Sequence, residues 1–268
     1  MRIWTFGCSF TEYCWPTWAD IIIHQGESTG AQGYNLGRCG AGNQYIASRI
    51  WECNARYKFT KDDWVFISWS GMNREDRYLD QAGWQTLGNI NLAVYNEDFV
   101  RNVASEKHFA MRDCMLISST INGLKNLGVN VLHWTMNPYK QLIDCWAFHT
   151  ANNVVEIIDT YNIKFDIPPL MEIIGTLDQS TEAGKARISV TWDGENIIPE
   201  WHPTPKEHMH IVQDHIMKHV PWLQPSLSDK TKDFCLYWID KIDSMGKPIK
   251  LDNKNTGWLD RKTINVWD

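Results

Sequence analysis

Three short turns of the sequence contain residue types that acyl-transfer chemistry needs. They carry Ser9 in Gly7-Cys8-Ser9-Phe10-Thr11, Gly40 in Gly37-Arg38-Cys39-Gly40, and Asn73 in Ser70-Gly71-Met72-Asn73. A serine hydroxyl becomes a nucleophile when a neighbouring base removes its proton. Main-chain N–H groups and a side-chain amide can then stabilise the oxyanion that forms. Each turn also has a purely structural interpretation. Ser9 could be a helix N-cap, Gly40 a glycine that is needed for a positive φ, and Asn73 an asparagine bonded to its own turn.

The elements around these turns predict where they lie. Short apolar strands are expected at 2–6, 34–36, 63–69 and 129–135, and helices at 15–24, 44–57, 110–127, 141–161 and 203–220. Strands that alternate with helices and are apolar throughout are typical of a mostly parallel sheet covered on both faces. The predicted fold class is α/β, a three-layer α/β/α arrangement with a sheet of about five strands. Ligands bind beyond the carboxyl ends of such strands, so the three turns should meet there.

The domain organisation follows from the same reading. Residues 1–220 are predicted to form one α/β domain, with residues 74–108 as an irregular, lid-like insertion that carries Trp84, Tyr95 and Phe99. The charged run at 74–77 is interpreted as a solvated loop edge. Residues 173–196 are weakly patterned, with short strands expected. Residues 221–268 show no clear periodicity and are expected to form a Trp-rich C-terminal extension, packed on the domain or on a neighbouring molecule.

Four blocks in this order resemble the SGNH (GDSL-type) hydrolase family. Three of them are the turns at Ser9, Gly40 and Asn73, and the fourth is Trp201-His202-Pro203. The resemblance implies a flavodoxin-like sheet, with Ser9 as nucleophile and His202 as its base. It also implies an oxyanion hole formed by the N–H groups of Ser9 and Gly40 and by the amide of Asn73. A position for Ser9 at the start of the first helix would add a favourable dipole.

Two residues depart from the pattern of the family. Cys8 stands where the family has Asp before its serine, and Pro199 stands where the family has its acid, three residues before the histidine. The nearest carboxylate is Glu200, two residues before His202, and we predict that it orients the imidazole. Asp193 lies further upstream, and a main-chain carbonyl in place of a carboxylate would leave a Ser-His dyad. Gly42 replaces Gly40 as the donor if the register differs by two residues.

Composition excludes several classes of function. The formal charge is −6, from 26 basic and 32 acidic residues, and no basic stripe is present, so we expect no nucleic-acid partner. No apolar run reaches the roughly 18 residues of a membrane helix and no signal peptide is evident, so we expect no membrane partner and a cytoplasmic location. The seven cysteines include no CxxC pair and are expected to be reduced thiols.

Metal and cofactor sites were weighed on the same residues. His202, His208, His210, His215 and His219 crowd one region, and the last two have the i, i+4 spacing that zinc-binding helices use. The residue after His215 is Ile216, however, where a metalloprotease has Glu. The glycine run at 37–42 lacks the spacing of a phosphate loop and its Lys-Ser/Thr. We therefore expect neither a metal nor any other cofactor.

Taken together, the sequence predicts a serine esterase that hydrolyses a small acyl ester. An acetyl group on a carbohydrate is the predicted substrate. The 15 tryptophans offer faces that suit sugar rings, and the resemblance to the SGNH hydrolases implies substrates of this kind. An O-acyltransferase would use the same residues with an alcohol in place of water. The third alternative is a non-catalytic carbohydrate-binding or particle-structural protein that kept the fold, and it is favoured by Cys8 and Pro199.

Overall fold

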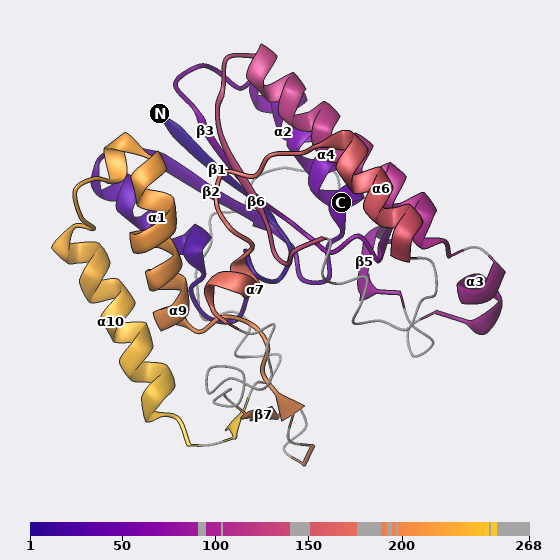
Figure 1. The fold of residues 1–268 in the computed structure, drawn as a ribbon. Coiled ribbons are helices and arrows are strands. Elements are labelled where there is room, and N and C mark those ends of the chain that lie inside the picture. Colours follow the sequence, from indigo (N-terminus) through magenta and orange to yellow (C-terminus); the bar gives the residue numbers. More distant parts are fainter. Residues whose placement is uncertain are drawn as a thin grey trace.

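The centre of the molecule is a four-stranded parallel sheet. The computed structural model describes residues 1–90, 95–102, 104–139, 151–175, 189–191, 195–196, 198–246 and 248–250. The strand order is β2-β1-β3-β6 (Figure 1). The strands are β1 (Arg2–Gly7), β2 (Gln32–Gly37), β3 (Trp64–Trp69) and β6 (Asn130–Thr135). This confirms the predicted fold class, with four strands in the described part of the chain where about five were expected.

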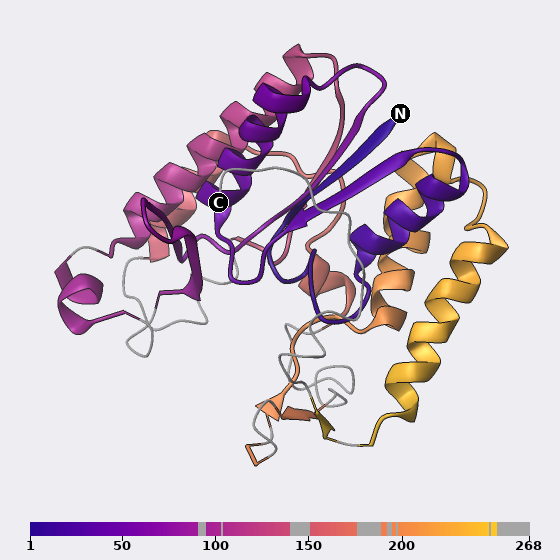
Figure 2. The same ribbon diagram turned by 180° about the vertical axis from the view of Figure 1, so that it is seen from behind.

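Helices cover both faces of this sheet. On one side α1, α9 and α10 pack on one another, and on the other side α2, α4 and α6 do so (Figures 1 and 2). Their bounds are α1 (Trp18–Ser28), α2 (Asn43–Tyr57), α4 (Glu106–Asn126), α6 (Ala151–Tyr161), α9 (Pro205–His210) and α10 (Asp229–Ser244). Residues 141–150 of the helix expected at 141–161 lie outside the described residues. The two helical layers bury the apolar strands on both faces, as a parallel sheet requires.

The strands that precede the three turns are in register, and β1 and β3 are buried. Ile3, Phe6 and Val65 are each 0% exposed. Ile3 pairs with Trp64 across β1 and β3, and Gly7 pairs with Gly37 across β1 and β2. Because all the strands of the sheet are parallel, the turns that follow β1, β2 and β3 lie at one edge of the sheet.

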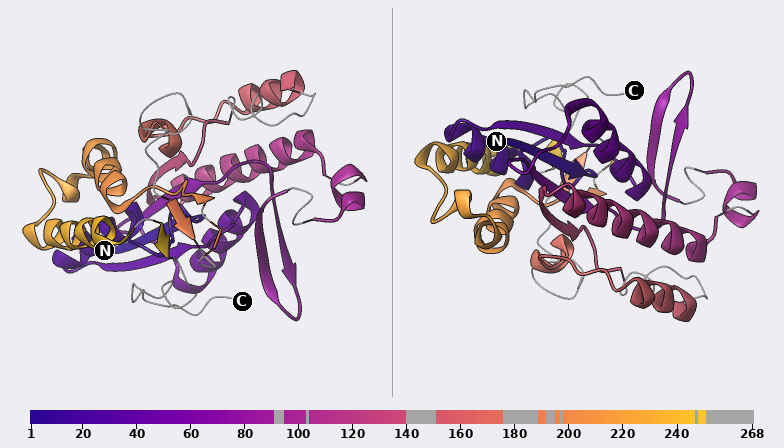
Figure 3. Two further views of the ribbon diagram at one scale, coloured as in Figure 1. Left: turned by 90° about the horizontal axis from the view of Figure 1, so that it is seen from below. Right: turned by 90° about the horizontal axis from the view of Figure 1, so that it is seen from above.

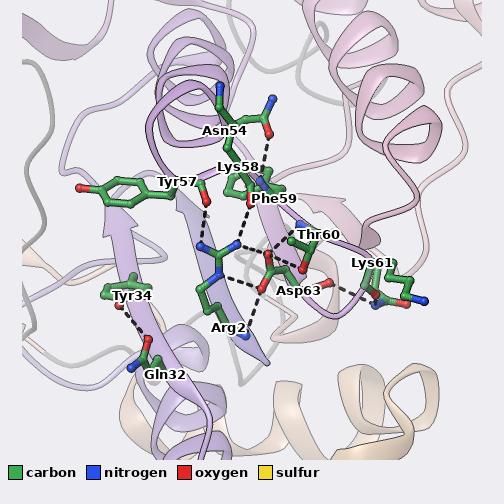
Figure 4. Close-up of polar contacts among 11 residues, drawn as sticks. Arg2, Gln32, Tyr34, Asn54, Tyr57, Lys58, Phe59, Thr60, Lys61 and Asp63 are labelled. Atoms are coloured by element: carbon green, nitrogen blue, oxygen red, sulfur yellow. Dashed lines mark hydrogen bonds and ion pairs between the residues drawn. The ribbon is translucent and has the colours of Figure 1, made fainter.

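A cluster of polar side chains joins the N-terminal ends of β1 and β3, at the edge of the sheet opposite to the three turns (Figure 4). Arg2 at the start of β1 donates from Nε to Asp63 Oδ1 at 2.9 Å and from Nη1 to the carbonyl of Tyr57 at 2.9 Å. Asp63, just before β3, also accepts from the N–H of Thr60 at 2.8 Å. Burial alone would raise the pKa of Asp63, but the hydrogen bonds from Arg2 and Thr60 outweigh it and lower that pKa. The cluster therefore fixes where β1 and β3 begin relative to the end of α2.

The described residues of the segment 74–108 form regular elements, contrary to the prediction. It contains the antiparallel hairpin β4 (Arg74–Leu79) and β5 (Gly83–Asn89), the short helix α3 (Glu97–Asn102) and the beginning of α4. Figure 3 shows the hairpin extending away from the central sheet. The run at 74–77 is also not simply a solvated edge, because Arg74 is 8% and Asp76 is 1% exposed. The strands of this hairpin are held by main-chain pairing, and Arg74 and Asp76 have specific partners. The segment therefore lacks the apolar periodicity from which strands and helices are predicted.

The C-terminal part differs from prediction in two ways. The expected helix at 203–220 is α9 followed by a π-helical segment, Ile211–Ile216, and a 3₁₀ segment, Met217–His219. The extension, expected to lack periodicity, contains α10, in which Ser228 caps the first turn by accepting from Thr231 N–H. Further short elements are α7 (Leu170–Ile173), a 3₁₀ turn (Pro221–Leu223) and the small sheet β8-β7-β9 (Ile198–Pro199, Ser189–Thr191, Ile249–Lys250).

Among the described residues, no helix is both long enough and apolar enough to cross a bilayer. Asp193 and the tryptophans 258 and 267 of the extension lie outside the described residues.

Candidate active site

Ser9 lies in a tight turn directly after β1. The N–H groups of Thr11 and Glu12 both donate to the carbonyl of Cys8, at 2.9 and 3.1 Å, and close the turn. A Cβ on Gly7 would meet Thr11 Oγ1 at 2.0 Å, so the chain can pass here only with glycine. Helix α1 begins at Trp18, nine residues after Ser9, so the expectation that Ser9 starts a helix is wrong. A helix dipole therefore does not act at Ser9, and the turn alone sets its position.

The side chains of Ser9, His202 and Glu200 form one hydrogen-bonded row. His202 Nε2 lies 2.8 Å from Ser9 Oγ, and His202 Nδ1 lies 2.5 Å from Glu200 Oε1. A carboxylate can only accept, so Nδ1 carries the proton and Nε2 is left to accept the serine hydroxyl. Ser9 comes from the turn after β1, and the other two come from the segment between β8 and α9. The row has the order nucleophile, base, acid that activates serine.

Glu200 is held by three donors. Its Oε1 also accepts from the main-chain N–H of His202 at 2.8 Å, and its Oε2 accepts from the hydroxyl of Tyr13 at 2.7 Å. Glu200 is 6% exposed. Burial alone would raise its pKa, but the hydrogen bonds from His202 and Tyr13 outweigh burial and lower the pKa. Glu200 is thus a carboxylate at neutral pH. The side chain of Tyr13 was not among the predicted site residues.

The turns with Gly40 and Asn73 lie beside that of Ser9 at the same sheet edge. The N–H of Arg38 donates to the carbonyl of Gly7 at 3.0 Å, which joins the turns after β1 and β2. Gly40 has φ +75°. A Cβ on it would lie 2.1 Å from the carbonyl oxygen of Thr86 in the hairpin. Among the described residues, no acceptor engages the N–H of Ser9, the N–H of Gly40 or the amide of Asn73. These donors are available to a ligand.

The N–H of Gly42, the alternative donor to the oxyanion, is already hydrogen-bonded within the protein. Its N–H donates to Asp76 Oδ1 at 2.8 Å, and the other oxygen of Asp76 accepts from Tyr45 N–H at 2.8 Å. The buried carboxylate therefore caps the N-terminal end of α2. Burial raises the pKa of Asp76 in spite of these two main-chain donors. The contact also ties the glycine turn after β2 to the hairpin.

A second buried group fixes the end of β3, just before Asn73. Asn43, the first residue of α2, accepts from the N–H of Ser70 at 2.8 Å and donates to Asp113 of α4 at 2.9 Å. The hydroxyl of Tyr139 donates to the carbonyl of Ser70 at 2.9 Å. Burial raises the pKa of Asp113 to about 7. Asn43 and Tyr139 thus hold the N–H and the carbonyl of Ser70.

The five histidines that crowd one region of the sequence do not gather at one site, although the rings of His210 and His215 are in contact. His208 is 0% exposed, and burial lowers its pKa to about 3. His210 pairs with Asp214 through Nδ1 and Oδ2 at 2.5 Å on the surface, and His219 is exposed. Within the described residues, no group of three His, Cys, Asp or Glu side chains is placed to hold a metal ion. His202 alone of the five reaches Ser9.

Comparison with known proteins gives likenesses in structure. No protein-family model matches the chain, and neither does any curated protein. It is similar to a catalytic mutant of Axe2, an acetylxylan esterase from Geobacillus stearothermophilus, with TM-score 0.47 and 14% identity over 84% of this chain and 96% of that chain. It is similar to a member of the lipolytic G-D-S-L family from Veillonella parvula, with TM-score 0.40 and 16% identity over 78% and 92% of the two chains. It is also similar to the psychrotrophic esterase EstA from Pseudoalteromonas sp., with TM-score 0.41 and 11% identity over 84% and 99%.

An aromatic pocket lies between α2 and the hairpin. It has a volume of about 510 Å³ and is lined by Trp51, Tyr78, Trp84, Ser48, Glu52 and Ala55. The carbonyl of Trp84 accepts from Arg38 Nη2 at 2.8 Å, so one residue that lines the pocket is hydrogen-bonded to the turn after β2. Sequence analysis pointed to Trp84 as part of the insertion, but not to this pairing with α2.

Proposed function

We propose that this protein is a serine ester hydrolase in which Ser9 is the nucleophile, His202 the base and Glu200 the acid. The single observation that carries the proposal is the row of contacts from Ser9 Oγ to His202 Nε2 at 2.8 Å and from His202 Nδ1 to Glu200 at 2.5 Å. Such a row supplies what a serine hydroxyl lacks, a base in hydrogen-bond reach and a group that orients that base.

The reaction has two halves. Ser9 Oγ attacks the ester carbonyl carbon while its proton passes to His202 Nε2. The tetrahedral intermediate then collapses, the C–O bond to the alcohol breaks, and His202 returns the proton to the leaving oxygen. Water next attacks the acyl-serine, again with His202 as base, and the carboxylic acid leaves from Ser9 Oγ. Glu200 stays ionised and stabilises the imidazolium that exists in each half.

The oxyanion of both tetrahedral intermediates needs donors. We assign this role to the N–H groups of Ser9 and Gly40 and to the side-chain amide of Asn73. The support is their place at one edge of the sheet and the absence of a competing acceptor among the described residues. Loss of one such donor typically lowers the rate by about 10²–10³-fold.

The proposed substrate is a small acyl ester, an acetyl ester, on a carbohydrate. The support is the aromatic pocket of Trp51, Tyr78 and Trp84, because Trp84 is hydrogen-bonded through its carbonyl to Arg38 in the turn after β2. Flat aromatic faces combined with a hydroxyl such as that of Ser48 suit the apolar faces and hydroxyls of sugar rings. Comparison of acetylated xylo-oligosaccharides with long-chain lipid esters tests this assignment, and a preference for long acyl chains contradicts it.

A fluorophosphonate probe tests the reaction class itself. We expect the probe to label Ser9, as mapped by mass spectrometry, and we expect no labelling in Ser9→Ala and strongly slowed labelling in His202→Gln. A folded wild-type protein that does not react would instead support the non-catalytic alternative. Product analysis with a free sugar in excess then distinguishes hydrolysis from acyl transfer, because a transferase yields the acylated sugar and little free acid.

A further inference from the structure

Tyr13 connects the segment of the nucleophile to the segment of the base. It lies four residues after Ser9 and is 9% exposed. Its hydroxyl donates to Glu200 Oε2 at 2.7 Å. Its ring stacks on the imidazole of His202, with ring centroids 4.0 Å apart and an interplanar angle of 19°. One side chain therefore contacts both the acid and the base.

The hydroxyl completes the set of donors around Glu200. Both donors from His202, the main-chain N–H and Nδ1–H, bind Oε1. Among the described residues, Tyr13 is the donor that binds Oε2. A carboxylate with only one oxygen held can rotate about its last bond, and this rotation would turn Oε1 away from the imidazole.

The ring of Tyr13 is itself fixed. The edge of Trp15 packs on it with centroids 4.7 Å apart, and Trp15 Nε1 donates to the carbonyl of Pro203 at 2.8 Å. Tyr13 and Trp15 belong to a small core that also contains Val190 of β7 and Trp238 of α10. The aromatic surface under His202 is therefore anchored by three parts of the chain that are distant in sequence.

We propose that Tyr13 is a positioning residue of the site, which holds Glu200 by its hydroxyl and the plane of His202 by its ring so that Nε2 faces Ser9. This inference rests on the proposed function, since it assigns Tyr13 to the same reaction. It goes beyond the blocks of the family, because those blocks contain neither this tyrosine nor an acid at position 200.

The hydroxyl and the ring are tested separately. Tyr13→Phe removes the hydroxyl alone, and we expect kcat for 4-nitrophenyl acetate to fall about 10–100-fold with KM within twofold. Tyr13→Leu removes the ring as well, and we expect a further loss. Tyr237→Phe on α10, where the side chain is 59% exposed, is the matched control and should retain wild-type rates.

The pH profile separates positioning from a general loss of structure. Tyr13 helps to lower the pKa of Glu200, so Tyr13→Phe makes this carboxylate a stronger acceptor toward His202. The hydrogen-bonded pair of Glu200 and His202 then takes up its proton more readily, and the acid limb of kcat/KM moves to higher pH. His202 and Tyr13 are the titratable groups in contact with Glu200, and Cys39 lies within electrostatic range. A 3-fluorotyrosine at position 13 keeps the ring and is a stronger donor, so it should move the limb to lower pH even if Tyr13→Phe folds poorly.

The outcomes separate this inference from the proposed function. If Tyr13→Phe retains the wild-type kcat and acid limb while Ser9→Ala is inactive, the role of Tyr13 is refuted and the ester hydrolase stands. If the fluorophosphonate probe leaves wild-type Ser9 unlabelled, the proposed function fails, and the role of Tyr13 fails with it. Opposite shifts of the acid limb, to higher pH in Tyr13→Phe and to lower pH with 3-fluorotyrosine, together with the two-step loss of kcat support the inference.

Discussion

Replacement of Glu200 by Gln decides between a triad and a dyad. The substitution keeps the size of the side chain and removes its charge. An amide can still accept one hydrogen bond from His202 Nδ1, but it no longer balances the positive charge on the imidazolium. We expect kcat to fall by about three powers of ten with KM nearly unchanged, because the charge on His202 exists in the transition state and not in the bound ester.

The magnitude follows from the geometry. Glu200 Oε1 lies 2.5 Å from Nδ1, and the carboxylate is 6% exposed. For two unit charges about 4 Å apart, with the effective dielectric constant of about 20 that suits protein sites, the interaction is about 4 kcal/mol. Each 1.36 kcal/mol corresponds to a factor of ten in rate, so loss of the interaction predicts about 10³-fold.

The assay is the steady-state release of 4-nitrophenol from 4-nitrophenyl acetate, with single-turnover acylation of Ser9 measured in parallel. Glu195→Gln serves as the control, because Glu195 is an exposed carboxylate only five residues upstream. Thermal midpoints of both variants confirm that they are folded. A loss below tenfold in Glu200→Gln would refute the electrostatic role and leave a Ser9–His202 dyad oriented by other groups.

Three further predictions concern the oxyanion donors and the buried histidine. Asn73→Ala should lower kcat about 10²–10³-fold with little change in KM. Gly128→Ala should cost about 1 kcal/mol in urea unfolding for its φ of +74° alone, whereas Gly40→Ala should cost at least about twice as much, because its Cβ would also lie 2.1 Å from a carbonyl oxygen. His208 stays neutral in the folded protein, so stability falls as the pH drops below about 6.5. At pH 5 this loss is about 2 kcal/mol. Urea unfolding of His208→Leu should show less of this loss, and the exposed control His219→Leu should show all of it; equal slopes for both variants would contradict the assignment.

The parts of the fold that sequence could predict are those that one local pattern determines. The runs of β1, β3 and β6 are apolar without polar alternation, which is typical of strands covered on both faces. This pattern was enough to predict a parallel sheet with its turns at one edge. The contact between Glu200 and His202 could likewise be predicted from the sequence, because a side chain two residues away can fold back on the imidazole. The buried stripe of α10, at Thr231, Cys235, Trp238 and Ile242, has helical spacing and could have been found.

The rest depends on partners that are distant in sequence. Asp76 looks like a surface charge until the main-chain N–H groups of Gly42 and Tyr45 are placed against it. Tyr13 and Glu200 are 187 residues apart, and nothing in either local segment indicates that one binds the other. The hairpin at 74–89 is polar on its surface, so its strands follow from main-chain pairing rather than from burial.

The order of the site residues along the chain has a consequence for synthesis on the ribosome. Ser9 and Tyr13 are made first, just after strand β1 of the sheet, whereas Glu200 and His202 come about 190 residues later. The four strands described in the sheet are complete at Thr135, so a nascent chain can form the sheet edge while its serine still lacks a base. Under the proposed function, hydrolytic capacity would then arise in one late step, when the segment 200–203 docks on Tyr13 and Trp15, and release of that segment alone would remove it without unfolding the sheet.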